Sequence, residues 1–312
     1  MSRPDFKPFL VAMVALFAIM DSGCRAISRI GESRQSIAAR RLSRQGLQAM
    51  HDGKWGIAEN LFTNALDVSS SDDRAHRGLA ESLWQRGERE AAIKHMENAV
   101  RLSASDPKLV QRLGRMYFEV GRLHEAHQQS VSLLESERNS AEVWALRGDC
   151  LNAQGNYDEA LPAYHRALAL RPDYPEVQMQ AAEIYRIQGR YDRLLATLDR
   201  LQEGLGGIEI PARADMLRGI AMRQLGQHQE ARRCFARAAT KNPNDADPHL
   251  QIASLCLDKG DVQSARDSVE VAIQLDPIAV RDGRWVEQLE NHPQCLSERA
   301  LPIDNAASST MR

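Results

Sequence analysis

The chain alternates short amphipathic segments with polar turns along most of its length. In residues 141–172, apolar and small side chains recur on one helix face from Trp144 to Leu151 and again, beyond Gly155, from Tyr157 to Ala167. A spacing of three to four residues between apolar positions is typical of an amphipathic α-helix. Because a glycine interrupts the pattern and Pro172 ends it, this stretch predicts two helices joined by a turn.

The same pattern returns along the chain at a nearly constant interval. The interrupting glycine recurs every 34 residues, with one interval of 37 residues, at Gly53, Gly87, Gly121, Gly155, Gly189, Gly226 and Gly260. Glycine or alanine also stands seven residues before each of these glycines, where it lets two helices approach closely. A single helix pair cannot bury its apolar face, so contiguous copies predict one elongated array.

This unit resembles the tetratricopeptide repeat, a helix–turn–helix unit of 34 residues with small residues at fixed points and a terminal proline. The resemblance covers about residues 39–279. It implies an all-α fold, a right-handed α-solenoid of about seven repeats with a C-terminal capping helix. The repeats are predicted at residues 39–72, 73–106, 107–140, 141–174, 175–208, 212–245 and 246–279.

Three segments lie outside the regular pattern. The long interval places a glycine-rich stretch, residues 204–211, between the fifth and sixth repeats, and we interpret it as a loop insertion and a candidate hinge. Residues 280–292 are predicted to form the capping helix, with Trp285, Val286 and Leu289 on its apolar side. Residues 293–312 are polar and aperiodic, and we expect them to be disordered.

The N-terminal segment, residues 1–24, has the features of a targeting or anchoring sequence. An apolar run of 12 residues, Phe9–Met20, follows two basic residues and suits a signal-peptide core better than a membrane-spanning helix. Ser22-Gly23-Cys24 resembles the end of a bacterial lipobox, which implies lipidation at Cys24, although Asp21 stands where that motif usually has an aliphatic residue.

Two other interpretations of this segment stay open. Arginines follow the apolar run in the basic tether, residues 25–38, and they favour an uncleaved anchor that keeps the repeats in the cytoplasm. Alternatively, the segment has no targeting role. We expect a membrane-associated protein of the bacterial cell envelope, held by a lipid or by an N-terminal anchor, and the sequence leaves the side of the membrane open.

Composition and motifs argue against catalysis. The 312 residues carry a formal net charge of −2, which gives no reason to expect a nucleic-acid partner. His124 and His127 are three residues apart, whereas a metalloprotease helix needs a spacing of four. Cys150, Cys234 and Cys256 are predicted to be buried, because their spacing fits no metal site. We predict a protein that is not an enzyme and has no cofactor, metal or small-molecule substrate.

The remaining candidate is a surface. In the family that the repeats resemble, positions 2, 5, 6, 9, 12 and 13 of each first helix face a concave groove. Carried onto repeats one to three, these positions predict a basic groove with an exposed ladder of large apolar side chains, whereas repeats four to seven are mildly acidic. The predicted peptide-binding residues are Arg44, Met50, Arg74, Arg77, Glu81, Trp84, Lys108, Gln111, Arg112, Arg115 and Phe118.

These observations favour a membrane-tethered scaffold for protein–protein interaction. The groove of repeats one to three is expected to bind extended or helical segments with acidic and hydrophobic side chains, since arginine pairs well with carboxylates and apolar anchors supply burial. The resemblance to bacterial repeat lipoproteins implies assembly of an envelope complex. The alternative is an accessory or regulatory subunit of an enzyme complex on the cytoplasmic side.

Overall fold

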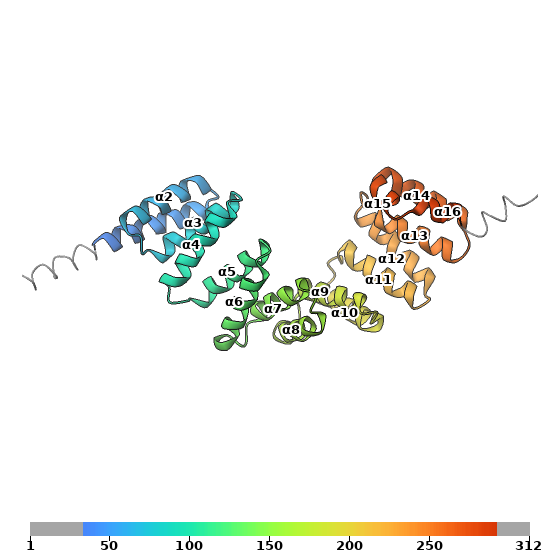
Figure 1. Ribbon diagram of the computed structural model, residues 1–312, viewed down its shortest axis with the longest axis horizontal. Coiled ribbons are helices and arrows are strands. Elements are labelled where there is room, and N and C mark those ends of the chain that lie inside the picture. The colour runs from blue at the N-terminus through green and yellow to red at the C-terminus, as the bar shows by residue number, and fades with distance from the viewer. Residues whose placement is uncertain (1–33, 292–312) are drawn as a thin grey trace, which may run out of the picture. The chain divides into compact units, whose positions relative to one another are not determined.

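The computed structural model describes residues 34–291, and all regular secondary structure in that range is helical (Figure 1). Residues 34–51 are helical. The following helices are α2 (Trp55–Val68), α3 (Asp73–Gln85), α4 (Arg89–Leu102), α5 (Pro107–Glu119), α6 (Leu123–Ser136), α7 (Ala141–Ala153), α8 (Tyr157–Leu170), α9 (Pro175–Ile187), α10 (Tyr191–Gly204), α11 (Ala212–Gln224), α12 (His228–Lys241), α13 (Asp247–Asp258), α14 (Val262–Leu275), α15 (Pro277–Asp282) and α16 (Trp285–Glu290).

The helices are organised as consecutive packed pairs in two compact units, one that ends at Gln154 and one that begins at Gly155. In the first unit, α3 packs on α4 and α5 packs on α6. In the second unit, the same relation joins α9 to α10, α11 to α12 and α13 to α14. Neighbouring pairs also contact each other within each unit, for example through α4 and α5. The predicted all-α fold of tandem helix pairs is confirmed.

The turn glycines have the conformation that their position in the repeat predicts. The recurring glycines from Gly53 to Gly260 have φ angles between 69° and 85°. A residue with a side chain rarely adopts this left-handed region, whereas glycine does so without steric cost. Each of these glycines therefore ends a first helix and lets the chain reverse into the second.

Close packing between helices depends on glycines that face aromatic rings. Phe62 of α2 is fully buried, and a Cβ atom added to Gly46 would lie 2.6 Å from its ring carbon Cε1. A Cβ atom on Gly78 of α3 would overlap the same ring. The Phe62 side chain is thus enclosed by a glycine of its own repeat and a glycine of the next repeat. In the second unit, Phe235 of α12 faces Gly219 of α11 in the same way.

We predict that Gly78→Ala destabilises the protein by about 1–3 kcal/mol, because the added methyl group forces the Phe62 ring out of a well-packed core. Chemical denaturation followed by circular dichroism measures this change.

Gly56→Ala is the matched control, since nothing lies within 4 Å of a Cβ atom at this position of α2. There the same substitution should stabilise the protein by roughly 0.5–1 kcal/mol, because alanine favours a helix more than glycine does. A loss of stability equal in both variants would contradict the role assigned to Phe62.

Buried polar contacts at the helix N-termini fix one repeat to the next in the first unit. Asp72 accepts hydrogen bonds from the backbone N–H groups of Arg74 and Ala75, at 3.0 and 3.1 Å, and so caps α3. Its other carboxylate oxygen accepts from Ser43 Oγ at 3.1 Å, on the helix of the preceding repeat. The start of α3 is therefore positioned by both repeats.

The insertion at residues 204–211 is tied down at its C-terminal end. Lys241 of α12 donates to the backbone oxygen of Ile210 and to the carboxylate of Asp215, both at 2.7 Å. Asp215 is fully buried, and Arg237 donates to its other oxygen at 3.0 Å. Gly206 and Gly207, which precede this anchored end, have positive φ angles, and the hinge stays a prediction.

We predict that Lys241→Met lowers the free energy of unfolding by up to about 3 kcal/mol, because it removes one partner of a buried charge and leaves Asp215 with Arg237 alone. Thermal and urea unfolding measure the loss.

Arg233→Gln on the same helix removes one half of an exposed ion pair with Glu230 and serves as the control. Its effect should stay below about 1 kcal/mol. Equal effects of the two substitutions would show that the Asp215 cluster is not a structural centre.

Both ends of the described chain differ in detail from the sequence-based expectation. Residues 34–38 belong to the first helix, so the predicted tether 25–38 is helical in its last part. Two short helices, α15 and α16, follow α14, where one capping helix was predicted. Leu289 is buried as expected, but Val286 is 49% exposed. Arg284, between the two short helices, has a φ angle of 51°. Residues 293–312 lie outside the described residues.

Candidate peptide-binding groove

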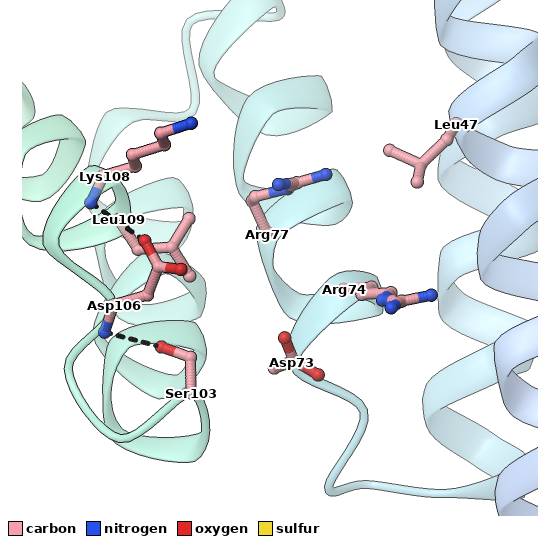
Figure 2. A pocket seen from close by; sticks show the side chains of 8 residues that line it. All are labelled: Leu47, Asp73, Arg74, Arg77, Ser103, Asp106, Lys108 and Leu109. Carbon is pink, nitrogen blue, oxygen red and sulfur yellow. Dashed lines mark hydrogen bonds between the residues drawn. The ribbon is translucent and has the colours of Figure 1, made fainter.

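A cavity of about 430 Å³, which we call the inner cavity, lies among the first helices of repeats one to three (Figure 2). The helix of residues 34–51, the N-terminal half of α3, and the start of α5 with the loop before it supply its wall. Its lining residues are Leu47, Asp73, Arg74, Arg77, Ser103, Asp106, Lys108 and Leu109.

The inner cavity contains cationic groups that the protein itself leaves uncompensated. Within residues 34–291, the side chains of Arg74, Arg77 and Lys108 form no ion pair. Figure 2 shows Arg74 and Arg77 extending from α3 toward the helix that carries Leu47, and Lys108 at the start of α5. Two acids share the lining. Asp106 accepts a hydrogen bond from the Lys108 backbone N–H at 2.9 Å and caps α5, while Asp73 lies in the first turn of α3. The cavity thus has an excess of one positive charge.

A second cavity of about 400 Å³, which we call the lateral cavity, adjoins the start of α5. It shares Asp106 and Lys108 with the inner cavity and extends toward the end of α6 and the start of α7. Its lining residues are Asp106, Pro107, Lys108, Gln111, Leu133, Glu137, Ser140 and Val143. Ser140 also caps α7, because its Oγ accepts from the Val143 backbone N–H at 3.3 Å.

The loop between α4 and α5 holds residues of both cavities in a constrained backbone conformation. Ala104 and Ser105 have φ angles of 53° and 62°, in the region that glycine prefers. The Ser105 backbone N–H donates to the Val100 oxygen at 2.9 Å, and the Asp106 N–H donates to Ser103 Oγ at 3.3 Å. The strained pair therefore aims the Ser103 and Asp106 side chains, which both line the inner cavity.

Two of the predicted groove arginines are engaged within the protein. Arg112 donates from Nε and Nη2 to the two carboxylate oxygens of Glu81, each at 2.8 Å. This forked pair raises the pKa of Arg112 above its ordinary value. Arg115 donates to Asp149 at 2.8 Å. These pairs join the first helices of successive repeats, so both arginines stabilise the stacking of the repeats and neither is a bare cation.

The expected exposed apolar ladder is wrong for Trp84. Its side chain is only 6% exposed and belongs to the hydrophobic core of the first unit. Arg89 and Arg112 lie over the ring, with their guanidinium carbons 4.0 and 5.5 Å from its centroid. Met50 and Phe118 are half-buried and pack against the same core. Trp84, Met50 and Phe118 therefore contribute mainly to the packing of the first unit.

Only some of the other predicted peptide-binding residues line a cavity. Arg74, Arg77 and Lys108 line the inner cavity, and Gln111 lines the lateral cavity. Arg44 is exposed and lines neither of these two cavities. Sequence reasoning missed the lining residues that come from loops, from the end of a second helix or from other positions of the first helix: Leu47, Asp73, Ser103, Asp106, Pro107, Leu109, Leu133, Glu137, Ser140 and Val143.

The candidates for metal binding, thiol chemistry and membrane insertion lie partly within the described residues. Residues 34–291 contain no group of three or more His, Cys, Asp or Glu side chains arranged to hold a metal ion. Cys150, Cys234 and Cys256 are buried and free, as predicted, and burial raises the pKa of the Cys150 thiol to about 12. Among these same residues, no helix has the length and apolar character needed to cross a bilayer. Cys24, the predicted lipidation site, lies outside the described residues.

Three family models, each described as a tetratricopeptide repeat, match this chain. One matches residues 141–174, one matches 44–107 and 216–278, and one matches 83–150. The matches include all the residues that line the two cavities.

Two curated relatives illustrate the similarity. Tetratricopeptide repeat protein 21A of Mus musculus is 25% identical over 177 residues, which is 57% of this chain and 13% of that protein. The Vi polysaccharide export protein VexE of Salmonella typhi is 24% identical over 223 residues, which is 70% of this chain and 34% of that protein. This chain therefore spans well under two thirds of the length of either relative.

Among solved structures, that of PilF from Pseudomonas aeruginosa superposes with a TM-score of 0.59 at 18% identity. The superposition covers 72% of this chain and 99% of that chain. At this level of identity the likeness shows the fold alone.

The strained loop yields a prediction. Ala104→Gly should stabilise the protein by about 0.5–1 kcal/mol, because glycine removes the cost of a left-handed backbone, which exceeds the added entropy of the unfolded chain. Ala236→Gly, at an exposed interior position of α12, should instead destabilise the protein by roughly 1 kcal/mol. Urea unfolding distinguishes the two, and a loss of stability in both variants would show that the loop is unstrained.

Proposed function

Since the chain belongs to the tetratricopeptide-repeat family, we propose that it is a non-enzymatic scaffold that captures segments of partner proteins in the groove of repeats one to three. One observation supports this most: Arg74, Arg77 and Lys108 line one cavity and form no ion pair among the described residues. Charges that a fold does not need for its own stability are available to a ligand, and arginine suits carboxylates in particular.

The groove also provides what an extended polypeptide requires. Two neighbouring cavities lie along the first helices, and polar side chains such as Gln111 and Ser103 border them. Arg112 and Arg115 hold the first helices of successive repeats together, so the surface is preorganised before the ligand binds. The arginines that face solvent add charge complementarity, which favours fast and selective capture.

We further propose that the protein acts at the bacterial cell envelope, tethered to the membrane through its N-terminus. The apolar run of residues 9–20 and the lipobox-like sequence that ends at Cys24 support this tether. The similarity to a protein described as a Vi polysaccharide export protein supports a role in assembling an envelope complex. The second candidate is an accessory subunit of an enzyme complex on the cytoplasmic side, which the arginines that follow the apolar run favour.

The groove is tested by removing its free charges. In its native cells, the tagged full-length protein is crosslinked, and the proteins captured with it are identified by mass spectrometry. The double variant Arg74→Gln/Arg77→Gln should retain its helix content and thermal stability but lose specific partners. Each lost charged hydrogen bond costs about 1.5–3 kcal/mol of binding free energy, so the two together weaken capture at least tenfold.

The matched control is Lys94→Gln/Arg101→Gln, which removes two exposed cations from α4, the second helix of the same repeat. This variant should keep every partner. Identical partner sets for the two double variants would place the interface outside the groove.

Protease accessibility of the repeats in spheroplasts distinguishes the two proposed locations. Digestion from outside the inner membrane supports the envelope scaffold, and protection supports the cytoplasmic accessory subunit.

A further inference from the structure

The inner and lateral cavities meet at the N-terminus of α5. Asp106 and Lys108 line both cavities, one on each side of Pro107. The loop that leads into this helix is held by the strained residues Ala104 and Ser105. A ligand that follows the groove from Leu47 past Lys108 therefore passes from the inner cavity into the lateral cavity.

The charge of the inner cavity limits what it accepts. Its lining includes three cations, Arg74, Arg77 and Lys108, and two carboxylates, those of Asp73 and Asp106. The excess of one positive charge matches one carboxylate, whereas a doubly charged phosphate would leave an uncompensated negative charge beside the two aspartates. Leu47 and Leu109 add apolar walls that suit the short hydrocarbon stem of an aspartate or glutamate side chain.

The lateral cavity has the opposite character. Its acids are Asp106 and Glu137 and its one cation is Lys108, so a second acidic side chain is disfavoured there. Pro107 of α5, Leu133 of α6 and Val143 of α7 supply apolar wall. An aliphatic side chain buries its surface against this wall without a charge to compensate. Gln111 remains to bond the ligand backbone.

We propose that the inner and lateral cavities form one binding site for an internal, extended polypeptide segment, with a side-chain carboxylate in the inner cavity and an aliphatic side chain in the lateral cavity. This assignment rests on the proposed function and narrows it. The preferred partner segment is not uniformly acidic, because the two cavities differ in charge. Because α5 has a fixed position between the two cavities, the carboxylate and the aliphatic side chain of the bound segment should be separated by a fixed number of residues.

The test uses glycine–serine peptides that carry one aspartate and one leucine at varied spacing. They are labelled with the uncharged fluorophore nitrobenzoxadiazole, and both ends are blocked so that the only carboxylate is a side chain. Binding to the full chain is measured by fluorescence anisotropy. One spacing should bind best. At that spacing, replacing aspartate by asparagine should weaken binding about tenfold or more, and replacing leucine by serine should weaken it by a similar factor.

Two protein variants assign the contacts. Arg77→Glu should invert the charge preference, so that a peptide with lysine in place of aspartate binds better than the aspartate peptide. Gln111→Trp should fill the lateral cavity, cancel the preference for leucine and leave the preference for aspartate intact. Circular dichroism and thermal unfolding confirm that each variant is folded, and Lys94→Glu on α4 is the charge-reversal control, which should change neither preference.

The outcomes separate this inference from the proposed function. Binding that is indifferent to the aspartate, to the leucine or to their spacing overturns the two-cavity assignment, as does binding that requires a free C-terminal carboxylate. An absence of binding at every spacing overturns it as well. The crosslinking experiment in cells decides the proposed function separately. If the Arg74→Gln/Arg77→Gln variant loses partners, the groove remains the binding surface. If it retains them, the proposed function is wrong.

Discussion

The close approach of neighbouring helices at small residues is the constraint on which the rest of the structure depends. Phe62 is enclosed by Gly46 of its own repeat and Gly78 of the next, so a single ring sets the distance within a repeat and between repeats. Helix–helix distances depend on the side chains at the contact, and glycine gives the smallest. These contacts hold α3 against the preceding repeat, and the start of α3 supplies Asp73, Arg74 and Arg77 to the inner cavity.

The polar groups of the groove divide into two sets with different roles. Arg112 and Arg115 pair with acids on the neighbouring repeats, and their charges contribute to stacking. Arg74, Arg77 and Lys108 are the second, fifth and second residues of their helices, and they pair with no acid within residues 34–291. Arginine thus contributes both to the ion pairs between repeats and to the inner cavity, and the presence of an acid on the neighbouring repeat decides which role it takes.

The repeat spacing predicted the helix pairs and the turn glycines, because both follow from local periodicity and from the conformational freedom of glycine. The positions of Arg74, Arg77 and Lys108 at a shared surface also followed from their place in the repeat. The burial of Trp84 was not predicted, because the exposure of a side chain depends on what covers it. Here two guanidinium groups from different helices cover the ring. The lateral cavity likewise depends on how α6 ends beside α7, and no residue pattern within one repeat encodes that contact.

Photocrosslinking in cells tests the central claim most directly, with a photoreactive amino acid at position 108, which lines both cavities, and at position 94 on α4 for comparison. The groove account predicts that position 108 crosslinks to one defined partner segment that contains a carboxylate side chain, whereas position 94 does not. Crosslinks from position 94 to the same segment, or none from position 108 above those from position 94, would contradict it.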